Sequence, residues 1–403
     1  MAKGNKCGTA NVCRRSVVGG AAAAGMAMAI DIALPRLAAA QDAAPIRIGM
    51  LNSYSKVFAF LGDSIFKGMF LYFDQINWQI AGRKIELIKE DDEISPQVGL
   101  DKARKLVEND KVDFIFGLLA SNVALAVAPF VQQSKTITFI NAGVTSVNQI
   151  RSPYIFRTAF SAQQLSAPMG AWMYNNFAKS LIASGSDYAA GHDVINEFKK
   201  AYLSSGGKIL QEIYPPLGTN DYSPYLTQIK SAAPPATYNF YAGADAVRFI
   251  NQYAALGLKD TVPLAGWGSL VTSDVIEAVG RNAIGCVTSS MYADTLDTPE
   301  NKAFVAAYQA KYNMLPSQFS SFGFTGARVL QEAVGNLKGD ISDKLKVSQA
   351  IANVKFQDPR GPFAFDPVTH NPIQNVYVLK TVAEGDKVSN KVIYTAPNVR
   401  DPV

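Results

Sequence analysis

Short apolar stretches alternate with helix-forming stretches along most of this chain, and this alternation constrains the fold more than any other feature. Residues 46–51 have the pattern of a buried strand, and a helix is expected to begin at Pro96, before the next strand. A strand, a helix and a second strand in succession favour a parallel crossover. The expected elements are a helix entry at 62–64, strands at 84–90, 112–116 and 136–140, and a helix at 123–133.

The same alternation begins again after Arg157 and continues to residue 290. The expected elements are helices at 162–177, 190–204, 222–232 and 246–256, and strands at 180–182, 208–214, 238–241, 262–265 and 285–290. Helices are expected at 301–312 and 324–337, and the tail at 361–396 has a β pattern. With 403 residues the chain has room for two domains. The sequence therefore predicts an α/β protein with two domains, in which ligand sites lie at the carboxyl ends of parallel strands.

The first forty residues differ from the rest of the chain. Basic residues precede an uninterrupted apolar stretch at 17–30, and Ala38, Ala39 and Ala40 end the segment. This layout predicts a secretory signal peptide over residues 1–40, because spanning a bilayer takes about 20 apolar residues. Arg14 and Arg15 resemble a twin-arginine signal, although the general export route stays open. We therefore expect a periplasmic protein with no stable membrane insertion after cleavage.

The charge balance argues against a nucleic-acid partner. The chain has 38 basic and 33 acidic residues, and no basic run offers a track for phosphates. Five of the basic residues and one acidic residue lie in residues 1–40, so the remainder is nearly neutral. Removal of the signal also leaves Cys286 as the single cysteine, and its apolar neighbours predict a packed thiol.

The sequence lacks the motifs of the common catalytic sites. It contains no GxxxxGK[ST] loop, no GxSxG elbow and no HExxH helix. His192 and His370 are its only histidines, which leaves little scope for a histidine-ligated metal or a Ser-His-Asp triad. We therefore expect no enzyme, no metal and no cofactor.

Several short motifs occur in an order that is typical of one protein family. They are found at residues 46–49, 111–117, 156–158, 186–191, 206–208, 220–223, 257–258 and 361–366. In this order the chain resembles the periplasmic solute-binding proteins of the branched-chain amino acid (Leu/Ile/Val-binding) family, which serve ABC importers. The resemblance implies two Rossmann-like lobes with parallel central sheets, joined by three crossovers, with the ligand between them. Lobe 1 would comprise 43–160 and 295–360, and lobe 2 would comprise 161–294 and 361–395. An inner-membrane ABC permease would be the partner.

The resemblance also implies a set of ligand-binding residues. The family holds a ligand carboxylate with a serine hydroxyl and backbone amides, and the matching positions here are Ser121 with Asn122, and Gly143 to Thr145. Ser121 precedes an expected helix, whose amino-terminal amides attract anions, and the alternative interpretation of Ser121 is a simple helix cap. Tyr188 matches a tyrosine at the rim of the second lobe, and its alternative role is that of an exposed loop aromatic.

One departure from the family pattern bears on the ligand. Amino-acid binders have a glutamate after the strand expected at 262–265, whereas this chain has Gly266, Trp267, Gly268 and Ser269 in the loop predicted there. A buried ammonium group without a counter-charge would be costly. We therefore expect the ligand to be a small carboxylate, and specifically an aromatic acid such as a benzoate or cinnamate derivative.

Aromatic side chains near the predicted site suit such a ligand. They are Trp267, Tyr188 and Phe60, with Phe322 as a further candidate, and the alternative role of the two phenylalanines is core packing. Three other functions remain open from the sequence: an amino-acid or amide receptor of the same family, a ligand-sensing regulatory receptor, and, with least support, an exported α/β hydrolase.

Overall fold

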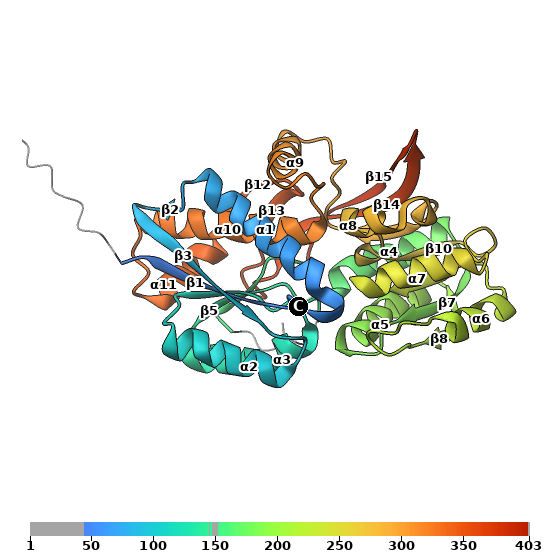
Figure 1. Cartoon of the computed structure of the whole chain (residues 1–403), viewed down its shortest axis with the longest axis horizontal. Helices are drawn as coiled ribbons and strands as arrows, with labels where there is room; N and C mark the ends of the chain where they lie inside the picture. The colour runs from blue at the N-terminus through green and yellow to red at the C-terminus, as the bar shows by residue number, and fades with distance from the viewer. Residues whose placement is uncertain (1–43, 145, 147–151, 402–403) are drawn as a thin grey trace, which may run out of the picture. The chain divides into compact units, whose positions relative to one another are not determined.

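A six-stranded sheet forms the first half of the fold (Figure 1). The computed structural model describes residues 44–144, 146 and 152–401, so the predicted signal peptide lies outside the described residues. Strands β3, β1, β4, β5 and β6 run parallel, and β2 is antiparallel at the edge. The strands are β1 (Ile46–Asn52), β2 (Gln79–Ile80), β3 (Arg83–Asp91), β4 (Phe114–Gly117), β5 (Ile137–Ile140) and β6 (Ile155–Arg157).

Helices cover both faces of this sheet. Helix α1 (Ala59–Gln75) packs against α10 (Gln318–Asn336), and α2 (Pro96–Arg104) packs against α3 (Ser121–Ser134). Figure 1 shows these two pairs on opposite sides of the strands, and α11 (Lys344–Ala352) lies beside α10. Strands β4 and β5 are buried along their whole length, as their apolar sequences require.

The second sheet has nine strands. Strands β8 (Lys208–Ile213), β7 (Ser180–Gly185), β9 (Thr237–Phe240), β10 (Leu264–Trp267) and β11 (Val287–Ser290) run parallel. Antiparallel strands from the carboxy-terminal tail complete it beside β11. They are β12 (Lys355–Asp358), β13 (Gly361–Phe365), β14 (Pro372–Glu384) and β15 (Lys387–Val399).

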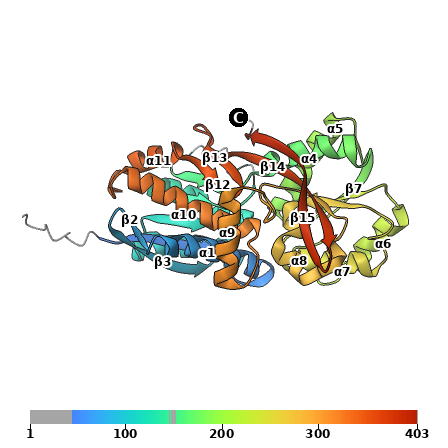
Figure 2. The ribbon, with the colours of Figure 1, turned by 90° about the horizontal axis from the view of Figure 1, so that it is seen from above.

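The helices of this half are α4 (Ala162–Asn176), α5 (Ala189–Ser204), α6 (Ser223–Ala232), α7 (Ala244–Ala255) and α8 (Ser273–Val279). Figure 2 shows the β14–β15 hairpin crossing this half above α8 and α7. The sheet is therefore mixed, whereas the sequence analysis expected a parallel one. The prediction of an α/β fold with two halves is confirmed.

The chain passes between the two sheets three times. It leaves β6 for α4, returns from β11 through α9 (Pro299–Tyr312) to α10, and re-enters the second sheet at β12 and β13. Strand β12 already pairs with β13, although residues 295–360 were assigned to lobe 1. The exact limits of the lobes stay a prediction.

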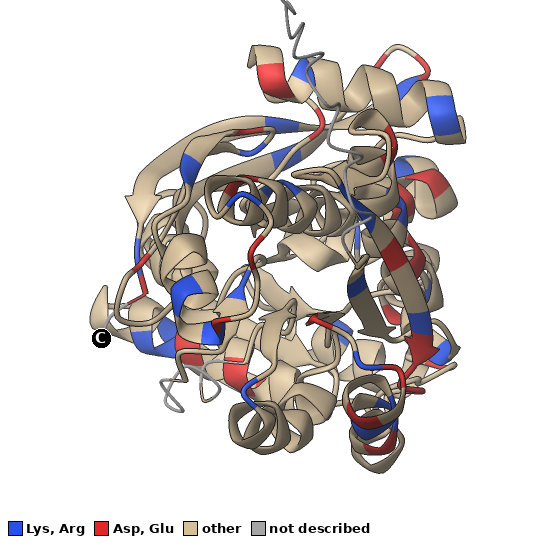
Figure 3. Ribbon diagram, turned by 90° about the vertical axis from the view of Figure 1, so that its left-hand side faces the viewer, with Lys and Arg blue, Asp and Glu red and all other residues tan. Residues whose placement is uncertain are grey.

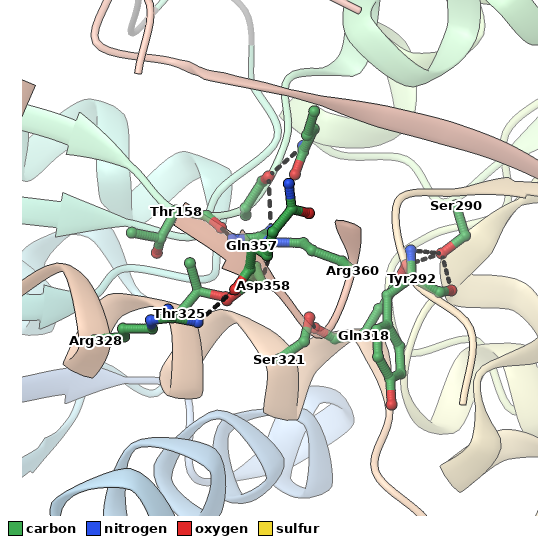
Figure 4. Close-up of polar contacts among 12 residues, drawn as sticks. Thr158, Ser290, Tyr292, Gln318, Ser321, Thr325, Arg328, Gln357, Asp358 and Arg360 are labelled. Atoms are coloured by element: carbon green, nitrogen blue, oxygen red, sulfur yellow. Dashed lines mark hydrogen bonds and ion pairs between the residues drawn. The ribbon is translucent and has the colours of Figure 1, made fainter. Parts of the chain in front are cut away.

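A buried ion pair links the first and third of these passages (Figure 4). Arg360 Nε lies 3.0 Å from Asp358 Oδ2, and Arg360 Nη2 donates to the carbonyl of Thr158 at 2.7 Å. Thr325 of α10 donates to the same carboxylate oxygen at 2.7 Å. These contacts hold the segments after β6 and β12 side by side.

Two of the boundaries that differ from the prediction affect predicted site residues. Helix α1 begins at Ala59, three residues before the predicted entry at Gly62, because the short 3-10 turn η1 (Lys56–Phe58) runs directly into it. Strand β10 ends at Trp267, so the placement of this side chain in a loop was wrong. The β10 pairing with β9 and β11 extends the strand past Ala265.

Within the described residues, no helix is both long and apolar enough to cross a membrane. Cys286 is a free, buried thiol, which confirms the prediction of a packed side chain. Burial raises the pKa of the Cys286 thiol to about 12.

Basic and acidic residues are interspersed over the ribbon in Figure 3, in keeping with the nearly neutral charge balance of the chain after residue 40.

Candidate functional site

A cavity of about 40 Å³ lies between the two sheets. Its walls come from segments that follow parallel strands of both sheets, which is where open α/β sheets place their ligands. The lining residues are Phe58, Leu119, Ser121, Asn141, Gly143, Phe160, Tyr188, Ala190, Val194, Phe240, Ala242, Trp267, Ser269 and Phe319. The cavity therefore collects four of the predicted site residues: Ser121, Gly143, Tyr188 and Trp267.

Helix α3 begins at this cavity without a side-chain cap. Its N-cap residue is Ala120, which has no side-chain acceptor, so the alternative interpretation of Ser121 as the cap is wrong. Ser121 is 1% exposed, and its hydroxyl makes no hydrogen bond to another described residue. The first amides of a helix have no intrahelical partner and carry the positive end of the helix dipole. Ser121 and these amides can therefore bind an anion.

The segment 142–144 after β5 is arranged in a similar way. The carbonyls of Ala142 and Val144 accept hydrogen bonds from Arg157, and the carbonyl of Gly143 accepts one from the amide of Ala162 at 2.7 Å. The amides of the same three residues donate to no described residue. Because the acceptors are occupied and the donors are not, this segment is suited to bind a carboxylate. The predicted Thr145 lies outside the described residues.

A second helix, α5, also begins at the cavity. Tyr188 is its N-cap residue, forms no side-chain cap, and lines the cavity together with Ala190 and Val194. Helices α3 and α5 contact each other, so two helix amino termini meet here from the two sheets. Burial and the nearby carboxylate of Asp245 raise the pKa of Tyr188, so its hydroxyl stays protonated. The half-buried ring packs near Phe58, which does not fit the alternative of an exposed loop aromatic.

Aromatic rings form the other walls. Trp267 is fully buried, with its ring centroid 5.0 Å from that of Phe160 and 5.8 Å from that of Phe240. Both contacts are edge-to-face, and Phe319 completes this side. The indole nitrogen of Trp267 has no hydrogen-bond partner. The walls can therefore hold a flat apolar group, and they include one buried donor that a polar substituent could satisfy.

Three predicted residues do not line this cavity. Phe60, the second residue of α1, packs against both hydrophobic cores, and Phe58 of η1 lines the cavity instead. The side-chain amide of Asn122 donates to the carbonyl of Ile94 at 3.0 Å. Gly268 lies close to Ser289, beside a separate small pocket. The further candidate Phe322 is a core residue that makes an edge-to-face contact with Phe160.

Several lining residues were missed by the sequence analysis. Asn141, Phe160, Phe240 and Ser269 lie at the ends of strands or shortly after them, which is the signal that could have found them. Phe58 lies in η1 and has no such signal. None of the described lining residues carries a charge. Among these described lining residues, none offers a carboxylate to an ammonium group.

Comparisons with known proteins agree with this geometry. The periplasmic binding protein family matches residues 45–386. A Leu/Ile/Val-binding protein homolog 6 from Brucella melitensis is 30% identical over 372 residues, covering 91% of this chain and 95% of the relative. A solute-binding protein of an ABC transporter from Rhodopseudomonas palustris BisB5, solved in complex with 3,4-dihydroxybenzoic acid, is 32% identical with a TM-score of 0.85. That match covers 89% of this chain and 99% of the other.

A second solute-binding protein, from R. palustris and solved with benzoate, is 30% identical with a TM-score of 0.84 and covers 89% of this chain and 98% of the other. The predicted resemblance and the two-lobed fold are thereby confirmed. The chain belongs to the periplasmic binding protein family, within its Leu/Ile/Val-binding branch of ABC-transporter substrate-binding proteins.

Proposed function

We propose that this solute-binding protein captures an aromatic carboxylate, such as a benzoate or cinnamate derivative, in the cavity between its two sheets. It would then deliver this ligand to an inner-membrane ABC permease. Residues 1–40 would direct the protein to the periplasm and be removed. Members of the family are solute-binding receptors and not enzymes, so the alternative of an exported hydrolase is dropped.

One observation carries the proposal: hydrogen-bond donors suited to an anion converge on an aromatic cavity whose described lining has no charged side chain. The donors are the Ser121 hydroxyl, the uncapped start of α3 and the amides of 142–144. Such donors stabilise a carboxylate without a formal cation. The rings of Trp267, Phe160 and Phe240 suit the flat remainder of the ligand.

Two relatives support the aromatic class, since they were solved with benzoate and with 3,4-dihydroxybenzoic acid. An amino acid is the second candidate, because the family includes Leu/Ile/Val-binding homologues. Its ammonium group would enter the cavity without a carboxylate partner, which costs several kcal/mol. A sensing role would use the same ligand site, and the fold alone does not distinguish it from transport.

Isothermal titration calorimetry on the protein without residues 1–40 tests the proposal. Benzoate, 4-hydroxybenzoate and cinnamate represent the aromatic acids, and leucine, glutamine and hexanoate represent the alternatives. We expect one ligand per chain and the tightest binding from an aromatic acid. Tighter binding of leucine or glutamine than of every aromatic acid would refute the aromatic class.

A further inference from the structure

A fully buried arginine lies directly behind the anion-binding segment. Arg157, the last residue of β6, is 1% exposed. Its Nη1 donates to the carbonyls of Ala142 and Phe160, and its Nη2 donates to the carbonyl of Val144 at 2.8 Å. Its Nε donates to Asn371 Oδ1 at 3.0 Å, in the turn before β14. One guanidinium thus joins the anion-binding segment to the first passage between the sheets and to the tail.

These contacts decide which way the peptide groups of the segment face. The carbonyls of Ala142 and Val144 are turned to the guanidinium, on either side of Gly143, which lines the cavity. A carbonyl pointing at a bound carboxylate would repel it, whereas an amide would bind it. Without Arg157 the two buried carbonyls would lose their donors and would need others.

We propose that Arg157 is the positioning residue of the anion-binding segment 142–144. It holds the carbonyls of Ala142 and Val144 away from the ligand, so that the amide of Gly143, which shares a peptide group with the carbonyl of Ala142, faces the carboxylate. This inference rests on the proposed function. Arg157 itself does not line the cavity and acts through the backbone.

The fork shape of the guanidinium is required for this role. Arg157 donates to three carbonyls and one amide oxygen in a fixed arrangement, which the single ammonium of a lysine cannot reproduce. Burial lowers the pKa of Arg157 to about 10, while Asp401 and Asp193 oppose this shift, so the group stays protonated at neutral pH. Arg157→Lys therefore keeps the charge and removes the geometry.

Arg360 supplies a matched control. It is also fully buried and donates to backbone carbonyls, those of Thr158 and Ala159, but it does not contact segment 142–144. We expect Arg157→Lys and Arg360→Lys to lower the melting temperature by similar amounts. A purely structural role of Arg157 would make the two variants alike in ligand binding as well.

The readout is the ratio of the affinities for benzoate and benzyl alcohol, which share the ring and differ in the carboxylate. We expect Arg157→Lys to weaken benzoate binding at least about tenfold and benzyl alcohol binding less than about threefold. Arg360→Lys should keep the wild-type ratio. A ratio unchanged in Arg157→Lys, or lowered equally in both variants, would overturn the proposal.

Two further measurements keep the test decisive. Asn371→Ala removes the acceptor of Arg157 Nε and should lower the ratio of benzoate to benzyl alcohol affinity about threefold. This variant replaces Arg157→Lys in the test if Arg157→Lys does not fold. An unchanged ratio in Asn371→Ala would then overturn the proposal. If the wild-type protein binds no aromatic acid, the proposed function fails separately. Crystal structures of ligand-free wild type and Arg157→Lys then decide: the proposal requires the carbonyls of Ala142 and Val144 to turn in the variant, and unchanged carbonyls overturn it.

Discussion

Ser121 is the side chain that contributes most directly to the proposed carboxylate site. Its hydroxyl is buried at the cavity and makes no hydrogen bond to another described residue, so a bound carboxylate would be its first partner. Hydrogen bonds to charged groups are worth about 1.5–3 kcal/mol. Ser121→Ala should therefore weaken aromatic-acid binding about tenfold or more in calorimetry, with little change in melting temperature.

Ser134 at the other end of α3 is the matched control for this change. Its hydroxyl bonds within its own turn to the carbonyl of Val131 and to Thr136, away from the cavity. Ser134→Ala should leave affinity unchanged. Equal affinities for wild type and Ser121→Ala would place the carboxylate elsewhere.

The residues at the site were predictable where a short motif marks the end of a strand. Ser121, Gly143, Tyr188 and Trp267 follow from the family motifs or from the absence of a carboxylate after β10, and all four line the cavity. Arg157 was visible only as part of a motif. Its contacts with Asn371 join residues 214 positions apart, and such pairing leaves no local pattern in a sequence.

At the scale of elements, α7 meets the turn η1 through a glycine. Gly243, the N-cap residue of α7, has φ +62°, and a Cβ there would lie 2.1 Å from the carbonyl oxygen of Val57. This contact joins segments that follow strands of the two different sheets. Gly243→Ala should therefore hinder closure of the cavity and weaken ligand binding.

Gly257, just after the carboxyl end of α7, is the control for the steric contact between a Cβ at Gly243 and Val57. It also has positive φ, +73°, but a Cβ there would meet no atom within 4 Å. Both alanine variants should lose stability, because both glycines have a positive φ that side chains with a Cβ rarely adopt. Only Gly243→Ala should also lose affinity in calorimetry, and equal affinities in the two variants would show that this contact plays no part in binding.

The contact of α8 with α1 contains a carboxyl that should make stability depend on pH. Asp274 Oδ2 accepts a hydrogen bond from Ser64 at 3.1 Å, and burial raises the pKa of Asp274 to about 6. Between pH 4 and 6 the unfolded chain releases this proton while the folded protein keeps it, so the free energy of unfolding falls as pH rises. A difference of about 2 between two pKa values is worth about 3 kcal/mol.

Asp274→Asn should accordingly be more stable than wild type at pH 7.5 and similar to it at pH 4, measured by urea unfolding. Asp294, whose pKa is also raised by burial to about 6, would keep part of the pH dependence in the variant. The exposed Asp260 provides the control, because Asp260→Asn should follow the wild-type curve. A variant less stable than wild type at both pH values would contradict this role of Asp274.

The elements themselves were largely predictable, since apolar strands and amphipathic helices alternate with clear boundaries. The tail was harder to place. Strand β14 pairs antiparallel with β11 across about ninety residues, and this long-range pairing turns a sheet expected to be parallel into a mixed one. Local patterns indicate that a stretch is a strand but not which sheet edge it joins.

At the scale of the whole molecule, two sheets are linked by three passages, and the described residues that line the cavity come from both halves. This arrangement couples ligand capture to the relative position of the two halves, which is how a receptor can present its loaded state to a permease. The buried contacts of Arg157 and Arg360 tie the passages together next to the site. Ligand binding and closure are therefore expected to be one event.

A crystal structure of the protein with 4-hydroxybenzoate would show where the aromatic acid binds. We predict the carboxylate within hydrogen-bonding distance of the Ser121 hydroxyl and of an amide of 142–144, with the ring beside Trp267. A carboxylate bound away from both donor groups, or a ring outside this cavity, would contradict it.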